Sequence, residues 1–279
     1  MQVEEEMHQA TVTIPSQDEM TLLGTLARAN GEDLLHAIGD SVVPYPKPAV
    51  FISGGLDSTI LLHHLQGKTD EEIFTYSTGC PEENEFIYAT KVAEHYGTIH
   101  KNVEIHDILP TFAELQKHLD RPRFNLWPYW CYEAALEDGR KTVYIGEGMD
   151  EHFGGYWYKP ETSYQEYWAG VLEWSIPTHT QLAHLFNIKL QIPFLRLDVR
   201  QTMPYWDGEH RDKTHLRNLY KNIIPDFVVE RKKNPGRLNF CKIWDREIAP
   251  HIPVSKPETR LESYKIINKW VIEKWLESH

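Results

Sequence analysis

Cysteine is scarce in this sequence. The 279 residues contain three cysteines, far apart and without a CxxC pair: Cys80, Cys131 and Cys241. This spacing excludes a disulfide framework and a zinc-finger-like site, and it is typical of a reducing compartment. The sequence also lacks the run of about eighteen apolar residues that a membrane span needs. Its acidic first segment has no apolar signal-peptide core, so we expect a cytoplasmic protein that does not associate with a membrane.

Positive charge is scarce too. The chain carries 29 Lys and Arg against 41 Asp and Glu, which gives a formal net charge of −12. A protein that releases counterions from a nucleic-acid backbone normally presents a basic face, and the short basic run at 231–233 does not make one. The charge balance therefore argues against DNA or RNA as the substrate.

Short apolar runs alternate with helical segments in the first half of the chain. The pattern predicts strands at 49–53, 73–77, 100–105 and 142–145, and helices at 31–38, 59–66, 85–96 and 129–137. Strands that alternate with helices pair in parallel through right-handed crossovers. We therefore expect an α/β fold with a doubly wound parallel sheet, which binds ligands at the carboxyl ends of its strands.

The pattern changes after residue 155. Strand signals fade, and Trp and Tyr become frequent between 156 and 174. We expect a helical C-terminal part that covers one side of the sheet. The whole chain, 1–279, is predicted to be a single domain, in which the polar residues 1–30 form a lead-in segment.

A glycine-rich turn follows the first predicted strand. It reads Ser53-Gly54-Gly55-Leu56-Asp57-Ser58 and opens an apolar helical segment. The paired glycines allow a tight turn that brings backbone N–H groups close to an anion, and the helix adds the positive end of its dipole. Asp57 would repel a phosphate unless a divalent cation lay between them, so we interpret it as a magnesium ligand. The simpler alternative is a capped Gly-Gly turn; the missing GK[ST] excludes a Walker loop.

A second segment, rich in glycine and acidic residues, follows the fourth predicted strand. It reads GEGMDEHFGGY over residues 146–156 and contains the carboxylates of Glu147, Asp150 and Glu151. Carboxylates this close together are costly unless a metal, a cation or a shared proton relieves their repulsion. We expect this segment to face the nucleotide crevice; the alternative is a solvated acidic turn. His152 is a candidate for proton transfer.

These segments together are similar to a known enzyme family. The turn at 53–58 resembles the pyrophosphate loop of the N-type ATP pyrophosphatases, the PP-loop superfamily, and residues 146–156 resemble the GEGxDExFGGY of asparagine and β-lactam synthetases. Residues 191–195, QIPFL, resemble the family's RVPFL strand. A tail with the spacing of the family's K..LR…P…R.K pattern completes the resemblance: Lys213, Leu216, Arg217, Pro225, Arg231 and Lys233.

The resemblance implies an adenine nucleotide alpha-hydrolase-like fold and an ATP-dependent, AMP-forming amide synthetase. Such an enzyme adenylates a carboxylate, and ammonia or an amine then displaces AMP. The resemblance also implies that Asp57 and Asp150 hold Mg²⁺, and that Glu147, Lys213 and Lys233 are catalytic. It implies these nucleotide-binding positions: Ile52, Ser53, Gly54, Gly55, Asp57, Ser58, Thr78, Glu85 and Gly146.

The expected nitrogen source differs from that of the glutamine-dependent members of this family. Those begin with an amidotransferase domain whose nucleophile is an N-terminal cysteine, whereas this chain has Gln2 and about 50 residues before the glycine-rich turn. We therefore expect no glutaminase domain. Free ammonia, another amine or a glutaminase acting in trans would supply the nitrogen to a small-molecule carboxylate.

The residues expected on the acceptor side also differ from the family's pattern. Arg196 replaces the aspartate of the family's PFLD, and Lys189 occupies the approximate place of a glutamate that helps β-lactam synthetases deprotonate an amine. Residues 121–130, RPRFNLWPYW, do not resemble an aspartate-recognition segment, and their rings either wall another acceptor pocket or pack in the core. The alternative function is a PP-loop enzyme that modifies a nucleobase or nucleotide through an adenylated intermediate, with these rings stacking on the base.

Overall fold

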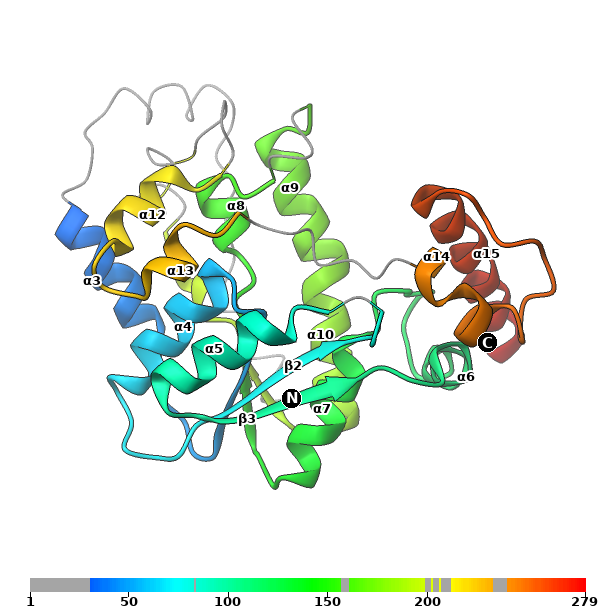
Figure 1. The fold of residues 1–279 in the computed structure, drawn as a ribbon, viewed down its shortest axis with the longest axis horizontal. Coiled ribbons are helices and arrows are strands. Elements are labelled where there is room, and N and C mark those ends of the chain that lie inside the picture. The colour runs from blue at the N-terminus through cyan, green and yellow to red at the C-terminus, as the bar shows by residue number, and fades with distance from the viewer. Residues whose placement is uncertain are drawn as a thin grey trace.

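Five parallel strands form the centre of the part of the chain that the structure describes (Figure 1). The computed structural model describes residues 31–82, 84–156, 161–198, 202, 206, 212–232 and 240–279. The strand order is β3-β2-β1-β4-β5, and every neighbouring pair is parallel. The strand bounds are β1 Pro48–Phe51, β2 Phe74–Gly79, β3 Ile99–Glu104, β4 Thr142–Tyr144 and β5 Lys189–Gln191. The predicted doubly wound parallel sheet is confirmed.

Strand side chains alternate between two hydrophobic cores, one on each face of the sheet. In β1, Ala49 and Phe51 pack into one core and Val50 packs into the other. In β4, Val143 belongs to the first core and Tyr144 to the second. Successive side chains of a strand point to opposite faces. A continuous apolar run is therefore what a strand needs when both faces of its sheet are covered.

Helices cover both faces of the sheet. The core that contains Val50 also takes residues from α3 Gly31–Ser41, α4 Leu56–Gln66, α5 Phe86–Tyr96, α8 Met149–Phe153, α12 Thr214–Tyr220 and α13 Asp226–Val229. The core that contains Ala49 takes residues from α6 Ile108–Gln116, α7 Pro128–Glu137, α10 Ile176–Leu185, α14 Phe240–Ile243 and α15 Arg260–Ser278. The helix α9, Tyr164–Gly170, continues through a π-helical turn, Val171–Ser175, into α10. A 3₁₀ turn at Pro193–Arg196 and a π-helical turn at Trp244–Ile248 complete the described helical segments.

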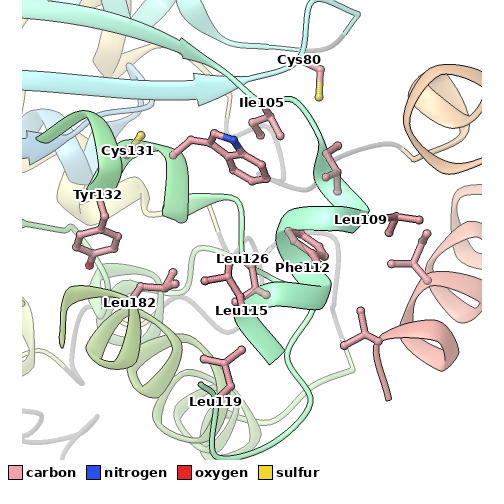
Figure 2. Close-up of a cluster of buried hydrophobic side chains, with 14 of the residues drawn as sticks. Cys80, Ile105, Leu109, Phe112, Leu115, Leu119, Leu126, Cys131, Tyr132 and Leu182 are labelled. Carbon is pink, nitrogen blue, oxygen red and sulfur yellow. The ribbon is translucent and has the colours of Figure 1, made fainter. Parts of the chain in front are cut away.

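The helices α6, α14 and α15 lie together at one end of the molecule (Figure 1). Figure 2 shows side chains of α6, among them Leu109 and Phe112, between the end of β3 and the C-terminal helices. The indole Nε1 of Trp275 in α15 donates a hydrogen bond to the carbonyl of Leu119 at 3.0 Å. The C-terminal helices are thus anchored beyond the carboxyl end of β3, on the side where a ligand crevice is expected.

Most of the predicted elements are present with shifted ends. The strands and helices predicted between residues 31 and 145 are confirmed, and α4 begins at Leu56 instead of residue 59. The helix α6 was not predicted. Its one proline, Pro110, stands in the first turn, where a missing N–H costs no helical hydrogen bond. None of the helices in the described ranges is long and apolar enough to cross a membrane.

The part after residue 155 contains a strand as well as the predicted helices. Residues 189–191 form β5 beside β4, with Thr142 opposite Lys189. The segment that resembles RVPFL contributes only its first residue, Gln191, to this strand, and Pro193 starts a 3₁₀ turn. A proline has no N–H for the sheet and its fixed φ suits a first helical turn. The predicted lead-in, 1–30, lies outside the described residues.

Candidate active site

The two glycine-rich segments meet at the centre of the sheet. β1 and β4 are neighbours, with Pro48 opposite Thr142 and Val50 opposite Tyr144. From β1 the strand order runs through β2 to β3 on one side, and through β4 to β5 on the other. Open α/β sheets form their ligand crevice where the order reverses in this way. The turn after β1 and the acidic segment after β4 line one cavity there, with a volume of about 1400 Å³.

Most of the residues singled out in the sequence line this cavity. They are Ile52, Ser53, Gly55, Asp57, Ser58, Thr78, Glu85, Gly146, Glu147, Asp150 and Lys213. Gly54 belongs to the same turn. Lys233 lies outside the described residues. The fold therefore gathers residues from five separate places in the chain, while their assignment to ATP and magnesium stays a prediction.

The turn at 53–58 requires glycine at its second position. Gly54 has a φ of +68°, a region that side chains rarely adopt, and a Cβ there would lie 2.4 Å from the carbonyl carbon of Tyr88. The hydroxyl groups of the turn bond its own backbone: Ser53 Oγ accepts from the N–H of Gly55 at 3.3 Å, and Ser58 Oγ accepts from the N–H of Ser53 at 3.3 Å. The turn is thus shaped before any ligand arrives, at the N-terminus of α4, where backbone N–H groups attract an anion.

A buried lysine joins the two segments. Nζ of Lys213 lies 2.5 Å from both carboxylate oxygens of Asp57 and also contacts the carboxylate of Asp150. The Lys213 side chain is only 4% exposed. Its backbone has a φ of 62°, which costs roughly 1 kcal/mol or more for a residue with a Cβ. A Cβ on Gly155 would collide with the Asp150 and Lys213 side chains, so the glycine leaves room for this ion pair.

Asp57 and Asp150 fit a magnesium ion that binds together with a phosphate. Mg²⁺ usually takes one or two protein carboxylates and completes its shell with phosphate oxygens and water. One ammonium group contacts both carboxylates, so a single cation can bridge them. Within the described ranges, no group of three or more His, Cys, Asp or Glu side chains makes a site that could hold a metal alone. The oxygen donors therefore suit a metal that is shared with a phosphate-bearing ligand.

Glu147 and Glu151 are two acidic side chains in different surroundings. Glu147 lines the cavity, whereas Glu151 is fully buried and accepts a hydrogen bond from the phenol of Tyr156. Burial, followed by the charge of Glu147, raises the pKa of Glu151 to about 7. Only the first of the pair can meet a ligand directly, so Glu147 is the better placed for chemistry.

His152 has a structural role. It is buried, it does not line the cavity, and both ring nitrogens are bonded: Nε2 to the carbonyl of Phe194 at 2.9 Å and Nδ1 to Thr202 Oγ1 at 2.6 Å. A carbonyl can only accept, so Nε2 carries the proton and Nδ1 accepts from the hydroxyl. Burial lowers the pKa of His152 to about 4. The interpretation of His152 as a proton-transfer group is therefore wrong.

Arg231 links the C-terminal tail to the glycine-rich turn. Its Nη1 donates to the carbonyl of Ser53 at 3.1 Å, its Nη2 pairs with the carboxylate of Glu85, and its guanidinium lies 3.9 Å from the ring centre of Tyr88. The ion pair places a positive charge beside the turn. Lys213 and Lys232 add two further cations to the lining beside the turn, where carboxylates also lie.

The two charge changes expected on the acceptor side lie elsewhere. Nζ of Lys189 sits 3.6 Å from the ring centre of Tyr45, and Arg196 donates to Gln191 Oε1 at 2.9 Å. Neither side chain lines the cavity. The interpretation of Lys189 and Arg196 as acceptor-side residues is therefore wrong, because β5 and the turn after it direct both side chains to packing partners.

The rings of the aromatic segment 121–130 divide between the two alternatives, packing in the core and forming a wall of the cavity. Trp130 is buried in the core, as core packing requires. Phe124 and Trp127 instead line the cavity, at the end remote from the glycine-rich turn. The ring of Phe124 meets that of Tyr264 in α15 edge to face, with centroids 5.9 Å apart. The anchored C-terminal helix thus helps to form this end of the cavity.

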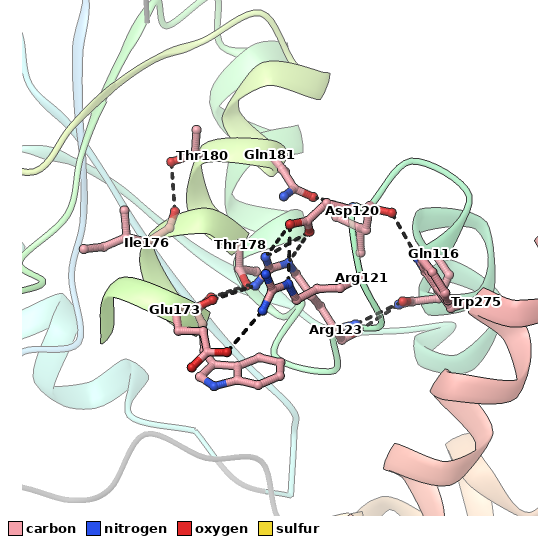
Figure 3. A network of polar contacts seen from close by, with 12 residues as sticks. Gln116, Asp120, Arg121, Arg123, Glu173, Ile176, Thr178, Thr180, Gln181 and Trp275 are labelled. Carbon is pink, nitrogen blue, oxygen red and sulfur yellow. Dashed lines mark hydrogen bonds and ion pairs between the residues drawn. The ribbon is translucent and has the colours of Figure 1, made fainter. Parts of the chain in front are cut away.

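A buried arginine holds this end together (Figure 3). The guanidinium of Arg123 binds both carboxylate oxygens of Asp120, at 2.9 and 3.2 Å from Nη2. Its Nη1 donates to the carbonyl of Trp174 at 3.1 Å and to Thr178 Oγ1 at 3.2 Å. A π-helical turn disturbs the regular helical ladder, and Arg123 binds a carbonyl in this one. The loop and the turn are therefore fixed relative to each other.

Several cavity residues carried no signal in the sequence. Arg121, Trp174, Thr178 and His179 line the same cavity as the glycine-rich turn. Arg121 and Arg123 were noted only as part of an atypical segment, and the α10 residues stand in a helix without any motif. They meet through tertiary packing between α7, α10 and the loop at 121–128, which spacing along the chain does not reveal.

A parallel sheet with an anion-binding turn and a helix N-terminus at its switch point is characteristic of nucleotide-binding α/β proteins. The family model described as asparagine synthase matches residues 32–195. The chain belongs to the asparagine synthase family, as the resemblance of its motifs predicted.

Two curated relatives match over most of the chain. It is 29% identical over 243 residues to asparagine synthetase B (glutamine-hydrolyzing) of Escherichia coli (strain K12), covering 72% of this chain and 43% of that protein. It is 26% identical over 224 residues to carboxyethyl-arginine beta-lactam-synthase of Streptomyces clavuligerus, covering 71% of this chain and 41% of that protein. The chain thus spans less than half the length of either relative.

A solved NMN synthetase from Francisella tularensis also resembles the structure. It aligns with a TM-score of 0.41 and 13% identity, covering 88% of this chain and 94% of that one.

Proposed function

We propose that this chain is an ATP-dependent, AMP-forming amide synthetase. A carboxylate oxygen of the acceptor attacks the α-phosphorus of ATP, and pyrophosphate leaves. The nitrogen of ammonia or an amine then attacks the acyl carbon, the bond from that carbon to the phosphate oxygen breaks, and AMP leaves. The observation that carries this proposal is the meeting of Asp57, Asp150 and Lys213 beside an anion-binding turn.

The cavity residues divide between the two steps. Backbone N–H groups of the turn, with Ser53 and Ser58, bind the phosphates. Lys213 and Arg231 stabilise the charge that grows on the leaving pyrophosphate, and we assign the same role to Lys233. Glu147 lies on the β4 side of the cavity and accepts a proton from the attacking nitrogen.

Magnesium would be held by Asp57 and Asp150 and would neutralise charge on the phosphates. Lys213, which contacts both carboxylates, would shift toward the phosphates when the metal is bound. Ammonia or a small amine is the proposed nitrogen donor, either free or from a glutaminase in trans. The three cysteines without disulfide partners agree with a reducing compartment, and we propose the cytoplasm.

A single assay tests the reaction class. The protein is incubated with ATP, Mg²⁺, ammonium and a panel of carboxylates, and both AMP and pyrophosphate are measured. Equal release of the two products, dependent on a carboxylate, is the expected result. Formation of ADP and phosphate, or turnover that requires a nucleobase instead of a carboxylate, would contradict the proposal.

A further inference from the structure

The end of the cavity remote from the glycine-rich turn has its own wall. We call it the acceptor chamber and define it by Phe124, Trp127, Val171, Trp174, His179 and Ile272, which all line the cavity. A cavity of about 1400 Å³ exceeds the volume of roughly 300–1000 Å³ that is typical for one ligand. A second substrate can therefore lie beside the nucleotide.

The walls are held in place from three directions. Arg123 ties the loop at 121–124 to the π-helical turn that carries Trp174. Phe124 packs on Tyr264, and Tyr264 shares one face of α15 with residues 268 and 272, spaced four apart. His179 accepts from or donates to the phenol of Tyr132 at 3.1 Å. The chamber is thus formed by the loop before α7, the π-helical turn, α10 and α15.

The chamber adjoins the reaction centre. Tyr132, which holds His179, is fully buried, and the charge of Glu147 helps to raise its pKa well above the usual value, after burial and Cys131. Glu147 also lines the same cavity as His179 and the other chamber residues, so the chamber and Glu147 share one continuous space. A carboxylate group that reaches toward Glu147 and the nucleotide leaves the rest of its molecule among the chamber walls.

The positive charges of the chamber are already matched by carboxylates. Arg123 is bound to Asp120, while Arg121 lies 3.3 Å from Glu173 and 3.5 Å from Asp120. Burial lowers the pKa of His179 to about 4, so the ring is neutral near pH 7. Among the described residues, the chamber offers no unmatched cation to a second carboxylate. A dicarboxylate such as aspartate would lose solvation there without an ion pair in return.

Two indole rings, those of Trp127 and Trp174, line the acceptor chamber. Trp174 is 44% exposed although it lines the cavity. The guanidinium of Arg121 lies 5.7 Å from the ring centre of Trp174, and Trp127 packs partly against the hydrophobic core, so each indole offers part of its surface to the cavity. Aromatic pairs gain stabilisation beyond the burial of their area, so these rings favour a flat, unsaturated partner over an aliphatic chain.

We propose that the acceptor substrate is an aromatic monocarboxylic acid, whose ring binds in the acceptor chamber and whose carboxylate points toward Glu147. This inference rests on the proposed function and names its substrate class. An aromatic acid meets both conditions of the chamber: its ring faces Trp127 and Trp174, and its single carboxylate is the group that is activated.

The test compares carboxylates and two variants of the π-helical turn. Isotope exchange between pyrophosphate and ATP is measured with benzoate, phenylacetate and indole-3-acetate, and with aspartate, terephthalate and acetate. Binding of benzoate is measured separately by calorimetry without ATP. Trp174→Ala removes a chamber wall, and Leu172→Ala is the matched control, because Leu172 is 36% exposed on the same turn but does not line the cavity.

We expect one of the aromatic monocarboxylates to stimulate exchange above the other acids. Trp174→Ala should raise its half-saturating concentration about tenfold, leave that of ATP unchanged, and weaken calorimetric binding of benzoate by a similar factor. Leu172→Ala should change neither the half-saturating concentration of the acid nor the binding of benzoate. Trp174→Phe should restore part of the affinity that Trp174→Ala loses. Exchange driven best by aspartate would overturn the substrate class while the reaction class stands. Benzoate binding that depends on Trp174, without exchange for any acid, would instead contradict the proposed reaction. If neither stimulated exchange nor Trp174-dependent binding of benzoate is observed, the assignment of the chamber as a site for an aromatic acid is overturned.

Discussion

The two halves of the cavity differ in how they are encoded. The half that we propose to bind the nucleotide, called the nucleotide half, comes from two short segments, 53–58 and 146–156, each placed directly after a strand. The acceptor chamber comes from side chains of a loop, a π-helical turn and two helices, with no common spacing. Phosphate chemistry depends on backbone N–H groups and charges at one turn, whereas recognition of an apolar body depends on surfaces that many elements share. The first half is therefore readable in the sequence, and the second appears only in the fold.

The largest effect should follow a change in the nucleotide half. Asp57→Asn should reduce pyrophosphate release at least a thousandfold. The amide keeps the shape of the side chain, but it lacks the negative charge with which the carboxylate would bind the metal. Steady-state turnover at saturating Mg²⁺ measures the loss. Asp70→Asn, an exposed position before β2, is the matched control and should retain full activity. Turnover by Asp57→Asn within tenfold of the unchanged protein would remove Asp57 from the metal site.

The second prediction divides the chemistry inside the cavity. Lys213→Met removes the ammonium beside Asp57 and Asp150. It should lower pyrophosphate exchange about a hundredfold, since loss of one preorganised charge costs about 3 kcal/mol in the transition state. Glu147→Gln should retain exchange and lose amide formation by a similar factor, because its role is proposed to begin with the nitrogen nucleophile. Isotope exchange and product formation are measured on both variants. If Glu147→Gln lost pyrophosphate exchange as completely as Lys213→Met, Glu147 would belong to the nucleotide site.

The third prediction concerns the frame of the acceptor chamber. Arg123→Met removes one hydrogen bond from the Trp174 carbonyl and one from the Thr178 hydroxyl, which stay bonded to each other, and it leaves Asp120 without its closest cation. We expect the free energy of unfolding to fall by about 2–3 kcal/mol. The KM for the acceptor should rise while that for ATP stays the same. Arg121→Met is the matched control for stability: Arg121 also pairs with Asp120, and with Glu173, but its side chain is 44% exposed, so its loss should cost under about 1 kcal/mol.

Urea unfolding of both variants measures this difference, and acceptor and ATP titrations give the two KM values. Similar unfolding energies for the two arginine variants would contradict the positioning role of Arg123. A rise in the ATP KM equal to that of the acceptor would mean that the two halves of the cavity are not independent.

The contrast between the halves also explains the outcome of the sequence predictions. The order of strands and helices up to residue 145 is written in local apolar runs and glycine turns, so the doubly wound sheet could be predicted. Lys213 was found because its spacing resembles a known tail. Its contact with Asp57 and Asp150, however, depends on a left-handed backbone at residue 213, which spacing does not specify.

Other residues were misjudged for a related physical reason. His152 stands inside a reactive-looking segment, but the short helix α8 turns it into the core, where Phe194 and Thr202 bind it. Lys189 follows the period of a strand that is only three residues long. Sequence position indicates which segment a residue belongs to, whereas side-chain direction depends on where the element begins and what packs on it.

The fourth prediction uses pH on the far side of the sheet from the chamber. His64 lies in α4 with Nε2 2.6 Å from the phenol of Tyr220. Burial, followed by the charges of His63 and Lys68 and opposed by that of Asp40, lowers its pKa from 6.5 to about 4. The unfolded chain therefore binds the proton more readily between pH 6.5 and 4, and stability should fall as the pH drops through this window.

The ring keeps part of its solvent exposure, so we expect His64 to contribute about 1–2 kcal/mol of this loss instead of the full value of the pKa shift. Urea unfolding between pH 7.5 and 4.5 measures the slope, and His64→Gln should flatten it. His36→Gln, which changes an exposed histidine on the adjacent helix α3, should not. An unchanged slope in His64→Gln would show that other groups control acid stability. Activity at pH 7 should be unaffected by either change if nucleotide chemistry is confined to the cavity.

The smallest effect is expected at Lys189, where the resemblance to β-lactam synthetases had indicated a residue near the attacking amine. Its ammonium lies over the ring of Tyr45, 3.6 Å from the centroid, and the side chain does not line the cavity. Lys189→Ala should therefore cost about 0.5–1 kcal/mol of unfolding free energy through the lost cation–π contact. Amide formation should stay within twofold, as should the acceptor KM. Lys189→Glu, which introduces the family's acidic residue, should likewise leave the acceptor preference unchanged. A large change in turnover or preference in either variant would place β5 within reach of the substrate, and the separation between packing residues and chamber residues on this side of the sheet would fail.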